Sequence, residues 1–225
     1  MSRAVLFDTE TTGLEPQLGH RVIEVAALEL LNDLPTGRHF HALIHPERDI
    51  PEDATRIHGF TLADLEGKPR FAAVVDNLME FFGEAQLIAH NAPFDFAFLD
   101  AEFNRLGLPK LAAARMVDTL ALAKARFPGM PNSLDALCRR FAIDLSARTR
   151  HNALLDCRLL AEVYVELTGG RQRGLSLAAE KSVAPPVVYY HTGDRRPRPM
   201  VPSAEDLAAH ATFIARLRDP IWLRP

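Results

Sequence analysis

Residues 4–14, AVLFDTETTGL, decide the fold expected for this chain. The apolar run from Ala4 to Phe7 is typical of a buried strand. Asp8 and Glu10 follow where that strand leaves the core, and residues two apart in a strand share a face. Carboxylates this close repel each other unless a cation neutralises them, and Mg²⁺ and Mn²⁺ bind such oxygen ligands. The segment indicates either a divalent-metal site or two solvated acids at a strand end.

Around this segment, the hydrophobic pattern predicts an α/β fold. Apolar runs typical of strands continue at residues 22–31, 40–44 and 87–89. The first three strands follow one another without a helix, which favours antiparallel pairing. Helical patterns then cover residues 71–82, 93–106, 119–127, 133–141 and 153–168. We therefore expect a mixed sheet flanked by helices.

A second acidic signal lies in residues 87–95, LIAHNAPFD. The strand runs into Asn91, a residue favoured as a helix N-cap, so that Asp95 falls in the first helical turn. The helix dipole favours a carboxylate there, which is by itself a sufficient reason for Asp95. His90 taken alone is typical of a structural histidine.

The third signal is HNALLD, residues 151–156. Asp156 lies beside the apolar stripe of the helix that follows, where a carboxylate needs a partner. His151 precedes the helix and can change its charge near neutral pH. Taken singly, His151 is also compatible with an ordinary loop histidine.

Together the three segments favour one chemistry. Four carboxylates and a histidine can form a two-metal site, in which ions about 3.5–4 Å apart stabilise the attacking and leaving oxygens of a phosphoryl hydrolysis. The histidine can then act as general base. The candidate residues are Asp8, Glu10, Asp95, Asp156 and His151.

Length and composition describe an ordinary domain. The 225 residues suffice for one globular domain with a tail, and a hydrophobic content of 48% excludes global disorder. No apolar run approaches the roughly 18 residues of a membrane-spanning helix, and the opening residues lack the features of a signal peptide. Two cysteines are too few for a disulfide framework or a cysteine-rich zinc site. We therefore expect a soluble, cytoplasmic protein.

The net charge of −3 is unevenly distributed. Residues 1–170 carry 17 basic and 24 acidic side chains, whereas residues 171–225 carry nine basic and five acidic ones. An acidic body is a poor autonomous nucleic-acid binder, because phosphate affinity comes mainly from Lys and Arg. If the body acts on nucleic acid, cations or a partner must help it.

The C-terminal part has a different organisation. Residues 182–202 are rich in proline and show no period, as in an extended linker. Ser203 is a good N-cap for a short helix over residues 207–217.

The three acidic segments resemble known motifs. FDTETTGL, LIAHNAPFDFAFLDAEF and HNALLDCRLLAEVYVELTGG resemble, in order and spacing, the three motifs of the DnaQ-like (DEDDh) exonuclease family over residues 4–170. Within that family, HRVIEVAALEL, IHGF and FPGMPNSLDALCRRF resemble segments of the epsilon (proofreading) subunits of bacterial DNA polymerase III. The resemblance implies a ribonuclease-H-like fold with a five-stranded mixed sheet. It also implies that residues 1–170 are a domain that removes nucleotides from DNA 3′ ends as 5′-monophosphates.

The resemblance assigns roles to individual residues. Asp8 would bridge two divalent cations, Mg²⁺ or Mn²⁺, with Glu10 and Asp156 completing the first site. Asp95 would support the second ion, directly or through water, and His151 would be the base. Contacts with the terminal nucleotide are implied for Thr11, Thr12, Asp53, Ile57, His58 and Phe94.

The tail resembles two tethers of such subunits. In the linker, residues 171–202, the side chains Gln172, Leu175 and Leu177 resemble a sliding-clamp-binding peptide, although no aromatic residue ends it. A linker that happens to contain two leucines is the alternative. Residues 203–225 resemble the segment that binds the polymerase III alpha subunit, and the expected contacts include Trp222, a favoured interface anchor. The other expected contacts are Phe213 and Leu217.

Three other functions fit part of the pattern. The same carboxylates can serve a free-standing exonuclease or an RNA-trimming enzyme of the same superfamily. A non-catalytic scaffold that stabilises the polymerase would be expected to have lost a ligand, and none is lost. The linker with its two candidate tethers favours a replication subunit, which would act at the nucleoid-associated replisome in the cytoplasm.

Overall fold

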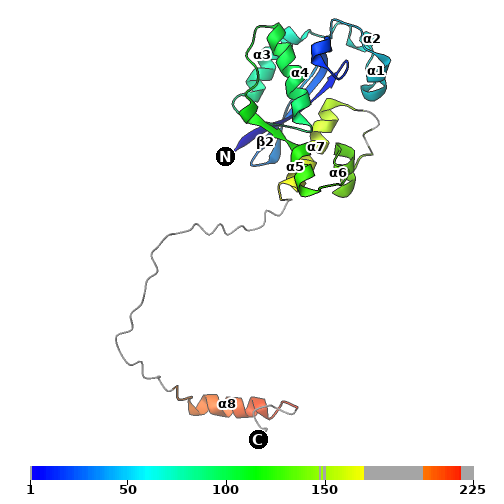
Figure 1. Cartoon of the computed structure of the whole chain (residues 1–225). Helices are drawn as coiled ribbons and strands as arrows, with labels where there is room; N and C mark the ends of the chain where they lie inside the picture. Colours follow the sequence, from blue (N-terminus) through cyan, green and yellow to red (C-terminus); the bar gives the residue numbers. More distant parts are fainter. Residues whose placement is uncertain (1, 147, 149–150, 170–199, 219–225) are drawn as a thin grey trace. The chain divides into compact units, whose positions relative to one another are not determined.

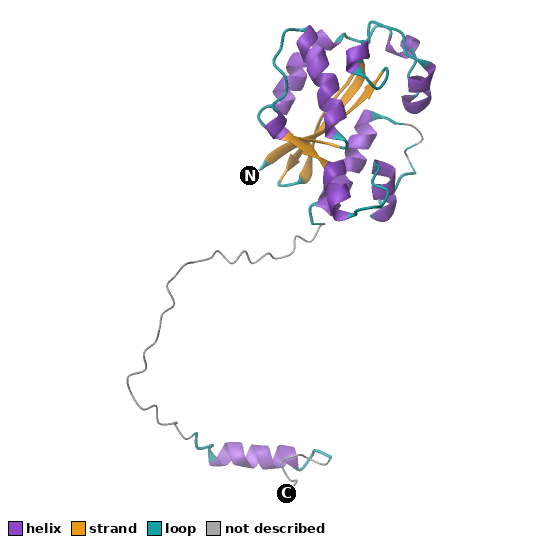
Figure 2. Ribbon diagram, viewed as in Figure 1, coloured by secondary structure: helices purple, strands orange, loops and turns teal. Residues whose placement is uncertain are grey.

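The computed structural model describes residues 2–146, 148, 151–169 and 200–218 (Figure 1). The chain divides into two units, residues 1–176 and 177–225, and each is described by itself. In the first unit, a sheet carries helices on both faces, drawn in orange and purple in Figure 2. No helix in the described ranges is long and apolar enough to cross a membrane.

A five-stranded sheet is the middle layer of the first unit. Its strands are β1 Arg3–Thr11, β2 Val22–Leu31, β3 Leu34–Leu43, β4 Gln86–Ala89 and β5 Met116–Asp118. They lie in the order β3-β2-β1-β4-β5. The β1/β2 and β2/β3 pairs are antiparallel, and the β1/β4 and β4/β5 pairs are parallel. The predicted mixed sheet and its antiparallel first three strands are confirmed.

Helices cover the two faces of the sheet separately. α3 (Phe71–Phe82) and α4 (Ala92–Arg105) pack on one face. The helices on the other face are α5 (Thr119–Arg126), α6 (Leu134–Arg140) and α7 (Ala153–Leu167). All five agree with the predicted ranges to within one residue at either end.

The central strand β1 supplies both hydrophobic cores. Val5 and Phe7 lie in the core beneath α3 and α4, and Leu6 lies in the core beneath α5, α6 and α7. This alternation follows from the two-residue period of a strand. β1 is therefore fixed from both sides up to Asp8, where the candidate site begins.

Several elements differ from the sequence prediction. β3 starts at Leu34 and not at residue 40. Its first six residues were not predicted, because they are exposed on an edge strand and show no apolar alternation. Other elements were missed because they are too short to show a hydrophobic period. These are β5, the helices α1 (Glu52–His58) and α2 (Leu62–Leu65), and the 3₁₀ turns η1 (Pro16–Leu18) and η2 (Ala113–Arg115).

The second unit contains one described helix, α8 (Ala204–Ile214). Ser203 caps it as predicted, since Ser203 Oγ accepts from the Asp206 backbone N at 3.1 Å. The helix begins and ends three residues earlier than the expected range of residues 207–217, because the cap starts the helix directly after Ser203. Phe213 is 58% exposed, and no residue of α8 is buried. The candidate contacts Gln172, Leu175, Leu177 and Trp222 lie outside the described residues.

Candidate active site

Parallel pairing of β1 and β4 brings their carboxyl ends to the same edge of the sheet. β1 places Asp8 and Glu10 at this edge, and β4 leads into α4, which carries Asp95 in its first turn. α7 carries Asp156, also in a first helical turn. Glu10, Asp95 and Asp156 are each at most 7% exposed, and Asp8 is half-buried. The four predicted carboxylates are close enough for the other three charges to act on Asp8.

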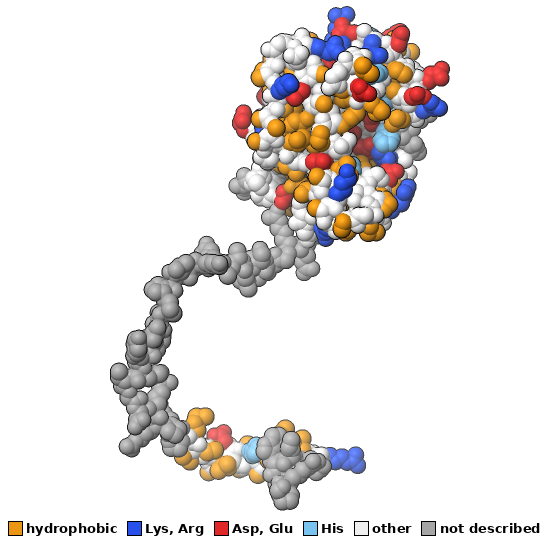
Figure 3. All heavy atoms as spheres, viewed as in Figure 1, with side chains coloured by type: hydrophobic (Ala, Val, Ile, Leu, Met, Phe, Trp, Pro, Cys, Tyr) orange, Lys and Arg blue, Asp and Glu red, His pale blue; other side chains and the backbone are white. Residues whose placement is uncertain are grey.

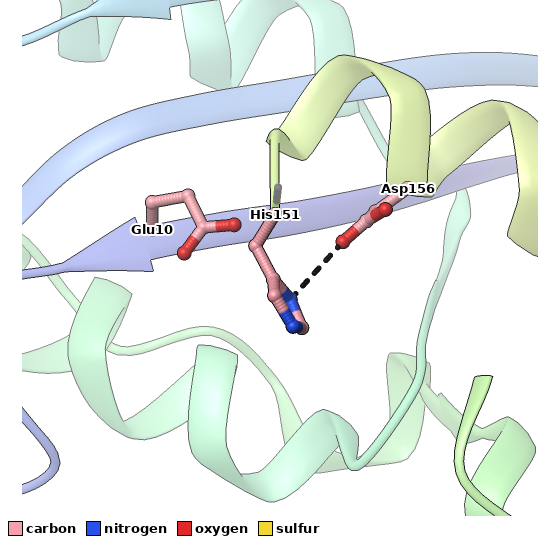
Figure 4. A group of neighbouring side chains, drawn as sticks. All are labelled: Glu10, His151 and Asp156. Atoms are coloured by element: carbon pink, nitrogen blue, oxygen red, sulfur yellow. Dashed lines mark ion pairs between the residues drawn. The ribbon is translucent and has the colours of Figure 1, made fainter. Parts of the chain in front are cut away.

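Glu10, His151 and Asp156 form a compact group within this cluster (Figure 4). One ligand atom from each lies within 4.8 Å of the other two. His151 Nδ1 is 3.4 Å from Asp156 Oδ2. Two carboxylates and an imidazole suit a divalent cation, so the residues fit the predicted metal. The resemblance implied that Asp8 would join Glu10 and Asp156 at one ion. The group of three in the structure contains His151 instead of Asp8.

Burial and mutual repulsion dominate the electrostatics of β1. Burial, followed by the charges of Glu24, Asp156 and Asp95, raises the pKa of Glu10 to about 8. The pKa of Asp8 is raised well above its ordinary value, first by burial and then by the charge of Asp95. A bound cation would relieve both effects, because it favours the ionised carboxylates. The cluster therefore has the electrostatic character of a cation site.

Asp95 is held by a contact with β1. Its Oδ1 accepts hydrogen bonds from the Thr9 backbone N at 3.1 Å and from Thr9 Oγ1 at 2.7 Å. Burial raises the pKa of Asp95 to about 7, although the bonds from Thr9 oppose the shift. Thr9 thus fixes the distance between the first and second acidic segments.

Asn91 is the N-cap of α4, as predicted, but its φ of 66° is left-handed and it caps the helix without a side-chain bond. Asp118, at the end of β5, does this work instead: its Oδ1 accepts from the backbone N of Asn91 at 3.0 Å and of Ala92 at 3.2 Å. The same oxygen accepts from Leu120 N at 3.0 Å in α5. One carboxylate therefore anchors the helix that carries Asp95.

Glu24 is a fifth carboxylate, which the motif pattern did not identify. It lies opposite Glu10 in the β1/β2 register and is fully buried. Its oxygens accept from Asn152 Nδ2 at 2.9 Å and from the Ala153 backbone N at 3.1 Å. His41 Nε2 on β3 lies 2.7 Å from Glu24 Oε1. Glu24 therefore ties the start of α7 to the sheet, and its signal in the sequence is a charge inside an apolar run.

His151 and Arg148, which precede α7, are each held by contacts with other parts of the chain. The His151 backbone N donates to Ile57 O at 3.3 Å, so this residue is attached to α1 although its side chain is 49% exposed. Arg148, which the sequence analysis did not single out, lies against Asp156, and its side chain is only 8% exposed. Burial would raise the pKa of Asp156, but the hydrogen bonds from Arg148 and the nearby His151 ring outweigh it and lower this pKa.

An open cavity of about 490 Å³ adjoins Glu10. Its rim includes the exposed apolar side chains of Leu14, Leu18 and Ile57. All six residues predicted to contact a nucleotide line this one cavity: Thr11, Thr12, Asp53, Ile57, His58 and Phe94.

These six residues are not equally available to a ligand. The Thr11 hydroxyl donates to Gly13 O at 2.6 Å, so its donor is used within the chain. Asp53 is paired with Arg56 on the exposed face of α1. His58 is 5% exposed, and its Nε2 has no hydrogen-bond partner among the described residues, which makes it a candidate donor to a bound molecule.

Comparison with known proteins gives a consistent assignment. A family model described as exonuclease (RNase_T) matches residues 5–164. The DNA polymerase III subunit epsilon of Rickettsia conorii is 42% identical over 221 residues, which is 96% of each chain. The protein of the same name from Escherichia coli is 43% identical over 187 residues, covering 80% of this chain and 76% of the other.

Solved structures agree at the level of the fold. Exonuclease X in complex with 5′-overhanging duplex DNA has a TM-score of 0.57 and 25% identity, covering 75% of this chain and 92% of the other. The nuclease domain of 3′hExo, a DEDDh family member bound to rAMP, has a TM-score of 0.63 and 17% identity, with 74% and 91% covered. The predicted ribonuclease-H-like exonuclease fold is confirmed. The chain belongs to the DNA polymerase III epsilon-subunit family, and it is a 3′–5′ exonuclease of a divalent-metal-dependent family.

Proposed function

We propose that this exonuclease is the proofreading subunit of a bacterial replicative DNA polymerase, which excises mismatched 3′-terminal nucleotides as 5′-monophosphates. The observation that carries the proposal is the meeting of Glu10, Asp156 and His151 within 4.8 Å, beside a cavity of about 490 Å³. Asp8 and Asp95 complete the acidic cluster. Its donors suit two divalent cations, Mg²⁺ or Mn²⁺, held by the four carboxylates, with Asp95 acting directly or through water.

The side chains support hydrolysis at the terminal phosphodiester. When bound, divalent cations supply positive charge to the attacking and leaving oxygens. His151 is half-exposed and lies beside two of the acids, so it can accept a proton from the attacking water. The water oxygen bonds to phosphorus as the bond from phosphorus to the preceding nucleotide's 3′ oxygen breaks. The terminal nucleotide leaves as a 5′-monophosphate.

The cavity suits a terminal nucleotide without reading its base. Ile57 and Phe94 present apolar surfaces, and His58 presents a ring nitrogen without a described partner, whereas Thr12 is fully buried in the wall of the cavity. Selection for mismatches then comes from fraying, because separating a mismatched end from the template strand costs less free energy than separating a paired one.

Charge supports the need for a tether. On the face of the first unit shown in Figure 3, acidic and basic side chains are interspersed and do not gather into a basic patch. Weak intrinsic DNA affinity is sufficient if a tether holds the enzyme near the primer end, because tethering raises the effective concentration. The similarity to the Rickettsia conorii protein, which its name assigns to DNA polymerase III, spans 96% of this chain and so includes most of the tail.

The two tethers are part of the proposal. We infer that residues 203–225 bind the polymerase alpha subunit and that the linker, residues 171–202, carries a sliding-clamp contact. The exposed apolar side chains Leu207 and Phe213 on α8 support the first inference. The proposed contacts are Phe213, Leu217 and Trp222 for the polymerase, and Gln172, Leu175 and Leu177 for the clamp.

A digestion assay tests this function. Full-length protein would be given matched and mismatched 3′ ends on primer–template DNA, and single strands of DNA and RNA, with Mg²⁺ or with EDTA. We expect Mg²⁺-dependent release of 5′-monophosphates, faster from the mismatched end and faster on DNA than on RNA. Equal or faster digestion of RNA would instead identify the RNA-trimming alternative.

A further inference from the structure

Arg148 makes more contacts in the acidic cluster than its position in a connecting segment suggests. Its guanidinium donates to both oxygens of Asp156, from Nε to Oδ1 at 2.5 Å and from Nη2 to Oδ2 at 2.7 Å. Nη1 donates to Asp135 Oδ1 at 2.6 Å, and Nη2 also lies 2.9 Å from His151 Nδ1. The buried guanidinium of Arg148 therefore connects the proposed general base, His151, and the proposed metal ligand, Asp156, with the start of α6.

The contact with Asp156 conflicts with metal binding. A bidentate guanidinium–carboxylate pair uses the oxygens in the geometry that a cation would also need. Asp156, Glu10 and His151 offer ligand atoms within 4.8 Å of one another, so a cation among them would lie close to the guanidinium. Two like charges cannot share so small and buried a space without mutual repulsion. Arg148 and a divalent cation are therefore alternatives at Asp156.

The contact with His151 conflicts with its role as a base. A guanidinium has only donors, so Nδ1 of His151 must be the acceptor in this hydrogen bond. In a neutral imidazole the other nitrogen, Nε2, then carries the hydrogen. As long as Arg148 keeps this contact, neither ring nitrogen can accept a proton from water.

We propose that Arg148 is a positioning residue that competes with the catalytic cation for Asp156, and that its displacement frees His151 to act as the base. The inference rests on the proposed two-metal hydrolysis. It makes metal loading and base release one event, since the same guanidinium blocks both. Asp135 is 38% exposed and outside the acidic cluster, and it can keep the displaced side chain nearby.

Metal titration of the full-length protein tests the competition. Mn²⁺ affinity would be measured by calorimetry at fixed pH and ionic strength for wild type, Arg148→Gln and the control Arg139→Gln. Arg139 is a suitable control because it also lies near Asp135, at 4.0 Å, but is 73% exposed and makes no described contact with Asp156. We expect Arg148→Gln to bind Mn²⁺ more tightly by on the order of tenfold, a typical coupling between two sites, and Arg139→Gln to match wild type.

A second measurement on wild type covers the case in which Arg148→Gln does not fold. Proton–nitrogen NMR spectra would follow the Arg148 Nε–H and His151 ring signals during Mg²⁺ titration. We expect the Arg148 signal to shift on saturation, and the metal-free His151 ring to carry its hydrogen on Nε2. Unchanged Mn²⁺ affinity in a folded Arg148→Gln, or an Arg148 signal that Mg²⁺ does not move, would overturn the inference and leave the proposed function standing. Absence of metal binding in wild type would overturn both.

Discussion

The Asp156 carboxylate is paired with Arg148 through two hydrogen bonds of 2.5 and 2.7 Å, although the same carboxylate belongs to the group suited to a cation. Asp8 has no such partner among the residues that the structure describes, and its pKa is raised by burial and by the charges of its acidic neighbours. Two carboxylates proposed as ligands of one site therefore differ in their effect on stability. The charge of Asp156 is stabilised by Arg148, whereas the charge of Asp8 is destabilised by burial and by its acidic neighbours.

This difference predicts opposite stability effects for two inactivating variants. Asp8→Asn removes a repelled charge, so the metal-free variant should melt no lower than wild type. Asp156→Asn leaves Arg148 without its main partner and should lower the unfolding free energy by about 1–3 kcal/mol, the cost of an unsatisfied buried group. Thermal melts in EDTA would measure both effects, and both variants should lose Mg²⁺-dependent digestion. Persistent digestion by Asp8→Asn would contradict the metal assignment.

The raised pKa values predict how stability depends on pH. The pKa of Glu10 is about 8 in the folded chain against an ordinary value of 4.5, and that of Asp95 is about 7 against 3.8. The folded chain therefore binds more protons than the unfolded chain within this range, and metal-free stability should fall as pH rises from about 4 to about 8. Mg²⁺ should offset the loss, so its stabilising effect should grow with pH.

Melting temperatures between pH 5 and pH 9, with EDTA or Mg²⁺, would measure this dependence. The control Glu10→Gln removes one of the titrating groups and should flatten the curve in EDTA. A metal-free stability that rises steadily from pH 5 to pH 8 would contradict the electrostatic picture of the cluster.

A third prediction concerns Glu24, which holds the start of α7 against the sheet. Glu24→Gln replaces an acceptor oxygen with a donor that faces Asn152 Nδ2 or the Ala153 N–H. We expect a loss of about 1–3 kcal/mol in stability and a fall in kcat with little change in KM, because His151 directly precedes these residues.

The matched control is Glu29→Gln on the same strand. Glu29 is also buried but pairs with Arg3 and Arg38 away from the acidic cluster. The Glu29→Gln substitution should lower the unfolding free energy without lowering the kcat of the folded protein. If Glu24→Gln and Glu29→Gln have the same effect on kcat, Glu24 does not position the base.

Most of the fold could be predicted because its signals are local. Helix α3 buries Phe71, Val74, Leu78 and Phe82, which recur at helical spacing, and its predicted bounds are confirmed. The exposed start of β3 and the three residues of β5 could not be predicted in this way. Both are recognised as strands only by their pairing with β2 and β4.

The candidate site divides along the same line. Asp8, Glu10, Asp95 and Asp156 were found because each lies at the end of a strand or the start of a helix that the sequence marks. Contacts between distant segments carry no such mark. Glu24 meets Ala153 across 129 positions, and Arg148 meets Asp156 from outside the helix that carries Asp156. The cap supplied by Asp118 to α4, 26 positions earlier, was missed for the same reason.

A fourth prediction decides between two roles for His151. If His151 is the general base, the substitution His151→Gln should lower the rate by roughly 10²–10⁴. The Mn²⁺ affinity of the variant should stay within a few-fold of that of wild type. The place of His151 in the group of Glu10 and Asp156 makes metal ligation the competing role. Calorimetric titration of the variant distinguishes the two, because loss of Mn²⁺ binding together with activity would make His151 a ligand.

The last prediction concerns α8, whose sequence and exposure favour a partner. Ser203 caps the helix, and yet none of the residues of α8 is buried, so its apolar side chains stay available to a partner. Deleting residues 203–225 should leave digestion of short single strands unchanged and abolish co-purification with the polymerase alpha subunit. Phe213→Ala should weaken binding by about 2 kcal/mol or more, as expected for an aromatic anchor. The control Thr212→Ala should not, since the Thr212 hydroxyl donates back to Ala208 O at 2.8 Å within the helix. Wild-type affinity of the truncated chain would instead assign the polymerase contact to the acidic body.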